Sequence, residues 1–118
     1  MSDFRKLRVW KGAQKLVIDA YRVSRGMRGP QSRDLADQLN RSTMSVPRNI
    51  IEGNEHKTPR ERARFFGYAL ASVSEAEGHI QTALDLEMIS ERDFDFLVAQ
   101  VVSVRKMLYG LLKGGEGS

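Results

Sequence analysis

Apolar residues recur at intervals of three and four over four stretches of this chain, which is the spacing of amphipathic helices. The predicted helices cover about residues 7–24, 33–56, 59–86 and 91–113. No stretch has the strict alternation of a half-buried strand, and no hairpin dipeptide joins two stretches. Because the connections are short, neighbouring helices should run in opposite directions. The pattern predicts an all-α fold, an antiparallel up-down four-helix bundle.

Residues that start and stop helices stand at the predicted boundaries. Thr58 and Pro59 precede and open the third helix, and Glu61 completes a T-x-x-E capping box. Ser32 and Ser90 are the expected N-caps of the second and fourth helices. The first helix is followed by helix-breaking residues, which are Gly26, Gly29 and Pro30.

The last two predicted helices hold more apolar residues than one buried stripe requires. The stripe of the first helix is Val9, Ala13, Leu16, Val17, Ala20 and Tyr21. The stripe of the third is Phe66, Leu70, Val73, Ile80 and Leu84, and a second arc there holds Phe65, Tyr68, Ala69, Ala76 and Ala83. In the fourth helix, Phe96 and Met107 lie off the main stripe. Either both helices have broad apolar faces within one bundle, or the extra arcs contact other subunits; we favour self-association.

The segment RSTMSVPRNIIEG, residues 41–53, keeps helical periodicity but gathers polar residues on one side. That side consists of Arg41, Ser45, Asn49 and Glu52. These residues form either a solvated face or a structural polar network buried against the third helix, where Ser72 and Glu75 would be their partners. We favour the network over an active site.

Pro47 lies in the middle of this segment. A proline removes one backbone donor and crowds the carbonyl of the residue four positions earlier, here Thr43, which costs roughly 3 kcal/mol in a regular helix. The hydroxyls of Ser42 and Thr43 can donate to carbonyls that a bend releases. We expect a helix kink at Pro47; the alternative is that one helix ends there and another begins.

Composition narrows the class of protein. The chain has no cysteine, which excludes disulfides and thiolate metal sites and fits a reducing cytoplasm. The N-terminal residues are polar and basic, and no apolar run approaches the roughly 18 residues of a membrane span. We therefore expect one soluble, cytoplasmic domain over residues 1–118 that does not enter a membrane, with a disordered tail at about residues 114–118.

Basic charge is concentrated in the first half of the chain. Residues 1–50 contain 11 Lys/Arg and 4 Asp/Glu, whereas residues 51–118 contain 8 and 11. On the first helix the basic residues opposite the apolar stripe are Arg8, Lys11, Lys15, Arg22 and Arg25, and Arg5 and Lys6 precede them. Such a face would bind phosphates in a strongly salt-dependent, largely sequence-independent way. A solvated helix face has the same composition, however, and we see no aromatic residues interleaved with the cations.

Metal and nucleophile chemistry find little support in the sequence. Glu52 with His56, and Glu75 with His79, are pairs spaced four apart, but the di-metal pattern of bundles uses Glu-x-x-His and a glutamate from each remaining helix. The first helix offers only Asp19, and the fourth has acidic residues only at its start. No serine stands in a nucleophile elbow. We predict a non-enzymatic protein with no metal, no cofactor and no small-molecule substrate.

Several motifs together resemble one protein family. The longest, L-x-x-Q-L-x-R-x-x-x-S-V-P-x-N-I-x-E-G, covers residues 35–53, while L-x-V-W-x-x-A covers 7–13 and F-x-x-A-L-x-S-x-x-E covers 66–75. K-M-L-Y at 106–109 matches loosely. This combination is similar to the small bacterial four-helix bundle proteins first noticed as reading frames within 23S ribosomal RNA intervening sequences. Gly12 departs from the family pattern and should weaken the first helix by up to roughly 1 kcal/mol relative to alanine.

The resemblance implies a bundle that assembles into a ring-like homo-oligomer, a homopentamer, which agrees with the broad apolar arcs. It supplies no enzymatic activity. More distant relatives are accessory proteins of diversity-generating retroelements, whose basic surfaces are thought to engage nucleic acid and a reverse transcriptase. By analogy we expect a nucleic-acid-binding accessory protein, with RNA as its ligand and the basic first helix as its binding face. The alternative is an assembly scaffold that binds protein and no nucleic acid.

Overall fold

The computed structural model describes residues 3–114, which form four α-helices and one short 3-10 helix. Their bounds are η1 (Phe4–Lys6), α1 (Arg8–Arg25), α2 (Ser32–Glu55), α3 (Pro59–Asp85) and α4 (Glu91–Leu112). No strand occurs within this described part of the chain. The four predicted helices are confirmed, each end falling within one residue of the expectation, whereas η1 was not predicted. Of the predicted tail, residues 115–118 lie outside the described residues.

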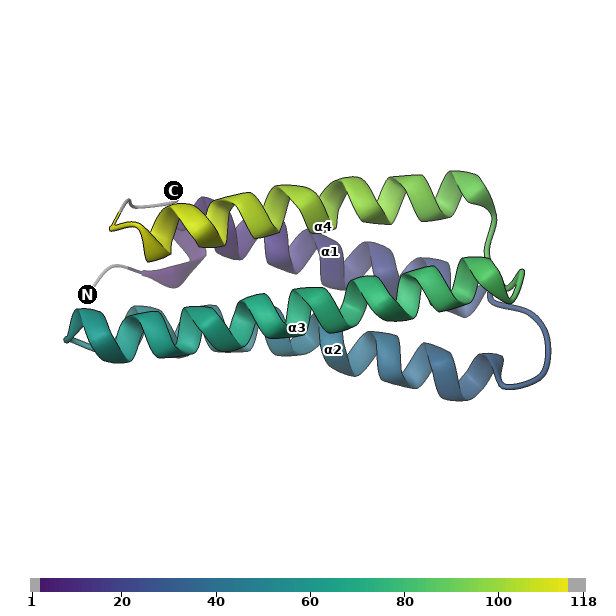
Figure 1. Cartoon of the computed structure of the whole chain (residues 1–118), viewed down its shortest axis with the longest axis horizontal. Helices are drawn as coiled ribbons and strands as arrows, with labels where there is room; N and C mark the ends of the chain where they lie inside the picture. The colour runs from purple at the N-terminus through teal and green to yellow at the C-terminus, as the bar shows by residue number, and fades with distance from the viewer. Residues whose placement is uncertain (1–2, 115–118) are drawn as a thin grey trace.

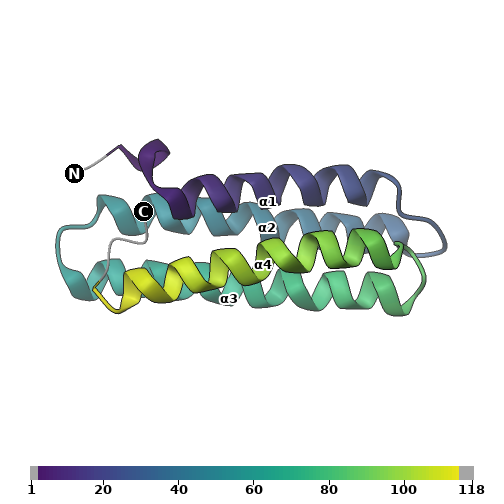
Figure 2. The ribbon, with the colours of Figure 1, turned by 90° about the horizontal axis from the view of Figure 1, so that it is seen from above.

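The helices lie side by side along a body of 46 × 21 × 20 Å, and consecutive helices run in opposite directions (Figures 1 and 2). Each helix packs on two others: α1 and α3 both contact α2 and α4. The 3-10 helix η1 contacts α1 and α2. It lies at the same end of the body as the α2–α3 connection and the end of α4 (Figure 1). The chain is therefore an all-helical protein in which the first and last helices are neighbours.

One hydrophobic core joins all four helices. Its largest fully buried side chains include Leu16, Leu39, Ile50, Ile80, Leu97 and Leu108. Ala69 and Ala76 belong to this core, and Ala83 is buried beside Leu35 and Met88 in a smaller cluster. The prediction of these three alanines as part of a surplus arc is therefore wrong, because their small side chains fill the interfaces of α3 within the chain. Tyr21, expected in the α1 stripe, is instead 52% exposed.

Side-chain caps fix the starts of α3 and α4. Thr58 Oγ1 accepts a hydrogen bond from Glu61 N at 3.2 Å, and Ser90 Oγ accepts one from Asp93 N at 3.1 Å, as predicted. Only the threonine half of the capping box forms, because the Glu61 carboxylate accepts from Arg64. The prediction for Ser32 is wrong: it is the first residue of α2, and the N-cap is Gln31 in a left-handed conformation with φ 68° and no side-chain cap.

Pro47 lies inside a single continuous α2, so the alternative of two shorter helices is wrong. The kink itself stays a prediction. Ser42 Oγ donates to Leu39 O at 2.8 Å, and Thr43 Oγ1 donates to Asn40 O at 3.1 Å. Both acceptors lie about one turn before the Thr43 carbonyl, which is the one that lacks its helical donor because of Pro47. Pro47 is itself buried, so its ring is part of the packed side of α2.

Candidate nucleic-acid interface

The basic residues predicted on the first helix all lie at the surface. We call Arg8, Lys11, Lys15, Arg22 and Arg25 the α1 basic face, and each of them is exposed. At 3.6 residues per turn they fall within an arc of about 100° on the outer side of the helix, opposite its buried residues. Arg5 and Lys6 are exposed on η1, and Arg5 Nη1 pairs with Asp3 Oδ1 at 3.2 Å. The structure thus brings the seven predicted residues onto two successive elements.

The acidic residue of α1 does not project among these cations. Asp19 is the one acidic side chain within Arg8–Arg25, and its side chain is only 11% exposed. Lys15 Nζ donates to Asp19 Oδ2 at 2.6 Å, and Gln100 Nε2 of α4 donates to the same oxygen at 2.9 Å. Arg22 Nη1 lies 3.9 Å from Asp19 Oδ1. Lys15 and Arg22 remain 61% and 75% exposed, so both side chains stay accessible at the surface.

The same contacts set the ionisation of Asp19. Burial raises the pKa of this carboxyl, but the hydrogen bonds from Lys15 and Gln100, with the charges of Lys15 and Arg22, outweigh burial and lower the pKa below its usual value. Asp19 is therefore a buried anion held between two helices. Its role on α1 is to position Lys15 and to link α1 to α4.

Exposed aromatic rings flank the α1 basic face, although the sequence shows no aromatic residues interleaved with its cations. Lys15 Nζ lies 5.0 Å from the ring centroid of Phe96 on α4, and Phe96 is 46% exposed. Arg25 Cζ lies 5.9 Å from the ring centroid of Tyr21. The helical spacing of Tyr21 and Arg25 could have revealed the second pair, whereas the first depends on the packing of α4 against α1.

The polar residues of α2 and α3 separate into two groups. Ser45 and Ser72 share a hydrogen bond of 2.7 Å between the two helices. Asn49 Nδ2 donates to Ser45 O at 2.9 Å and to Ser45 Oγ at 3.1 Å. The structure brings these three of the six predicted network residues together, all partly buried. Arg41, Glu52 and Glu75 are exposed, because their helical positions turn them away from the α2–α3 interface.

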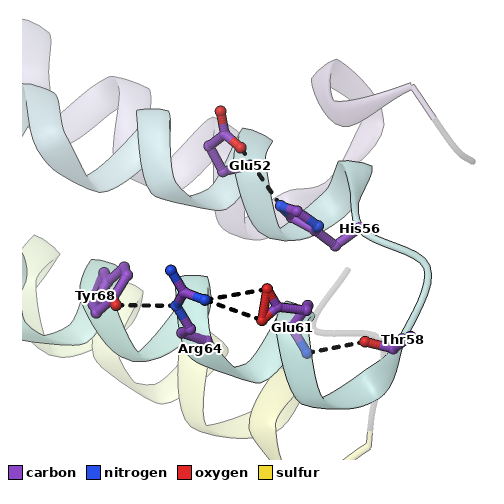
Figure 3. A network of polar contacts seen from close by, with 6 residues as sticks. All are labelled: Glu52, His56, Thr58, Glu61, Arg64 and Tyr68. Carbon is purple, nitrogen blue, oxygen red and sulfur yellow. Dashed lines mark hydrogen bonds and ion pairs between the residues drawn. The ribbon is translucent and has the colours of Figure 1, made fainter.

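A second polar cluster, which the sequence did not predict as a group, lies at the α2–α3 connection (Figure 3). Glu52 Oε2 lies 3.7 Å from His56 Nε2, and the His56 ring stacks on Phe65 with centroids 4.8 Å apart. On α3, Arg64 Nε donates to Tyr68 Oη at 3.0 Å and Arg64 Nη1 donates to both oxygens of Glu61 at 3.2 Å. The ion pair of Arg64 with Glu61 and the stacking of His56 on Phe65 stabilise the start of α3 and its connection to α2.

Among residues 3–114, no group of three or more His, Cys, Asp or Glu side chains gathers in a metal-binding arrangement. Across the same residues, no helix combines the length and the hydropathy needed to cross a bilayer.

The fold and this surface define an all-helical, four-helix protein with a basic first helix. The model of the 23S rRNA-intervening sequence protein family matches residues 5–110, and the chain belongs to that family, as the sequence motifs indicated. A crystal structure of a protein of unknown function from the S23 ribosomal protein family of Bacteroides thetaiotaomicron has a similar fold, with a TM-score of 0.81. At 17% identity the similarity covers 89% of this chain and 98% of that one. No curated protein sequence matches the chain.

Proposed function

We propose that this protein binds nucleic acid, RNA in particular, through the α1 basic face and η1. The observation that supports this most directly is the disposition of charge on α1. Its basic residues are exposed on one side, while its acidic residue is buried and hydrogen-bonded to Lys15 and Gln100. Cations exposed together on one side of a helix attract the phosphates of a nucleic-acid backbone through their summed charge. The family name refers to ribosomal RNA, which makes RNA the first ligand to test.

The test compares two variants that remove the same charge from different surfaces. In the first, Arg8, Lys11 and Arg22 are replaced by glutamine, and Lys15 is kept because it neutralises Asp19. In the control, Arg48, Arg60 and Arg62, which are exposed on α2 and α3, are replaced by glutamine. Binding of generic RNA and DNA duplexes is followed by fluorescence anisotropy at several salt concentrations between about 50 and 200 mM.

The wild-type affinity should fall steeply with salt, because binding releases counterions. The first variant loses three phosphate contacts, so the slope of the logarithm of its association constant against the logarithm of salt concentration should become shallower by between about 2 and 3. In the control this slope should stay unchanged. Equal effects of the two variants would show that the binding face is misassigned. Absence of affinity even at low salt would remove the nucleic-acid proposal and favour an assembly scaffold that binds protein alone.

We also propose that copies of the chain assemble into a ring-like homo-oligomer, a homopentamer as the family resemblance implies. The outer side of α3 and α4 supports self-association. Val102 and Tyr109 of α4 are 37% and 50% exposed, and they flank Arg105, which donates to Glu77 of α3. Beside Glu77, small residues recur at intervals of four, three and four along α3: Gly67, Ala71, Ser74 and Gly78.

The two glycines of this series have no explanation within the chain. A Cβ atom at Gly67 or at Gly78 would meet nothing within 4 Å. Each glycine nevertheless weakens a helix by about 1 kcal/mol relative to alanine. Close approach of a second copy would explain their small size. Sedimentation of the wild type should therefore give a multimeric mass, and Gly78→Leu should reduce it. Gln38→Leu, at an exposed position of α2, is the control and should leave the mass unchanged. A monomeric wild type at micromolar concentration would contradict the ring.

A further inference from the structure

Two aromatic rings border the α1 basic face, and neither is needed in the core. Phe96 and Tyr21 are 46% and 52% exposed, although burial of such rings is normally favourable. Phe96 lies beside Lys15, and Tyr21 lies beside Arg25, so each ring is next to a cation of the face. At the start of α4 the exposed Arg92 is accompanied by the exposed Glu91 and Asp95, so the cations of this surface are those of α1.

We propose that this surface binds single-stranded nucleic acid, with bases stacking on Phe96 and Tyr21 while Arg22 and Arg25 hold the phosphates. The inference rests on the proposed function and narrows its ligand. Grooves that bind single strands combine backbone-tracking cations with aromatic side chains on which unpaired bases stack. A duplex keeps its bases stacked on one another and presents phosphates alone to such a surface, so the rings add nothing to duplex binding.

The position of Phe96 separates this surface from the one proposed for self-association. Phe96 and Val102 are six residues apart, which places them about 120° from each other around α4. Phe96 faces α1, since it contacts Lys15, whereas Val102 lies on the outer side toward α3. Exposure of Phe96 is therefore compatible with a ring formed through α3 and α4. In such a ring the single-strand surface would be repeated in every copy.

The experiment measures the affinity of the full chain for four labelled oligonucleotides of equal length: oligo-U, oligo-dT, an RNA duplex and an abasic DNA strand. Oligo-U and oligo-dT distinguish RNA from DNA as the source of the bases. Phe96→Leu keeps an apolar side chain for packing but removes the π-face, and Phe96→Tyr keeps the ring. Tyr68→Leu removes an exposed ring from α3, which does not contact α1, and serves as the control.

The inference predicts that Phe96→Leu and Tyr21→Leu each weaken single-strand affinity about tenfold, the effect of losing one stacked base. Phe96→Tyr and Tyr68→Leu should bind as the wild type does, and duplex affinity should be the same in all variants. Wild-type protein should bind the abasic strand more weakly than oligo-dT.

Three results would overturn the inference while leaving the proposed function in place: equal wild-type affinity for the abasic strand and oligo-dT, unchanged single-strand affinity in Phe96→Leu, or an equal loss of single-strand and duplex binding in that variant. A lower sedimentation mass of Phe96→Leu would also count against it, because the ring would then belong to a subunit interface. Absence of salt-dependent affinity for any oligonucleotide would overturn both the inference and the proposed function.

Discussion

Glycines inside helices show at the residue scale how neighbours decide what a position tolerates. The sequence predicts that Gly12 weakens the first helix, and in the structure this glycine lies against α4. A Cβ atom there would lie 2.8 Å from Met107 Cε of α4, although that atom is the flexible end of a side chain. A Cβ atom placed at Gly53 would meet the aromatic ring of Phe66. The Cδ1 atom of the ring would lie 2.7 Å from that Cβ, and Cε1 would lie closer still.

Gly53→Ala should therefore destabilise the protein. The buried ring of Phe66 must shift to accept the methyl group, and overpacking of this kind costs between about 1 and 3 kcal/mol. Urea unfolding followed by circular dichroism at one protein concentration measures the change. Gly110→Ala on α4 is the control: its Cβ meets nothing within 4 Å, so the free energy of unfolding of this variant should stay equal or rise. A Gly53→Ala protein as stable as the wild type would contradict the packing of α2 against α3.

At the scale of the element, helix starts are set by short-range chemistry. Thr58 and Ser90 each satisfy a backbone N–H three residues later. Both were predicted from the sequence because a cap depends on neighbours along the chain. Ser32 looked equivalent, but it is the first residue of α2. The N-cap position is occupied by Gln31, which has a left-handed conformation.

The structure predicts that replacement by alanine has different effects on stability at Thr58 and at Ser32. Thr58→Ala should lower the free energy of unfolding by about 1 kcal/mol, because Glu61 N loses its side-chain acceptor. Ser32→Ala should change it by no more than a few tenths, because no cap is lost. Thermal or urea unfolding of the two variants side by side tests the assignment. A larger loss at Ser32 would show that the hydroxyl there is the real cap.

At the scale of the whole molecule, Asp19 links the first and last helices. Its oxygen accepts from Gln100, which is 81 residues away in sequence, as well as from Lys15 on its own helix. The pKa of Asp19 is lowered on folding, so folding favours the deprotonated carboxylate. Its contribution to stability is complete above the usual Asp pKa of 3.8 and disappears as the pH falls through the lower, folded pKa.

Asp19→Asn should be less stable than the wild type at pH 7, by about 1 kcal/mol for the loss of charge-assisted hydrogen bonds. The amide cannot titrate, so the difference between the two proteins should shrink as the pH falls below 3.8. Free energies of unfolding measured from pH 7 down to pH 3 test this. A constant difference across that range would show that the Asp19 carboxylate gains nothing from Lys15 and Gln100.

The sequence by itself determined the helices, their boundaries and the family. Periodicity of apolar residues, capping residues and the motif at 35–53 are local properties, and each depends on neighbours a few positions apart. The same reasoning placed the basic residues of the first helix on its outer side. Charge and periodicity along one helix are sufficient for that.

The tertiary structure decided which residues meet across helices. It reduced the predicted network to Ser45, Asn49 and Ser72, because position around a helix relative to its neighbours determines whether a polar side chain is buried. It also placed Phe96 beside Lys15 and buried Asp19 against Gln100. These contacts join residues about 80 positions apart, which no local pattern specifies, and they define the surface on which the proposed binding of single-stranded nucleic acid depends.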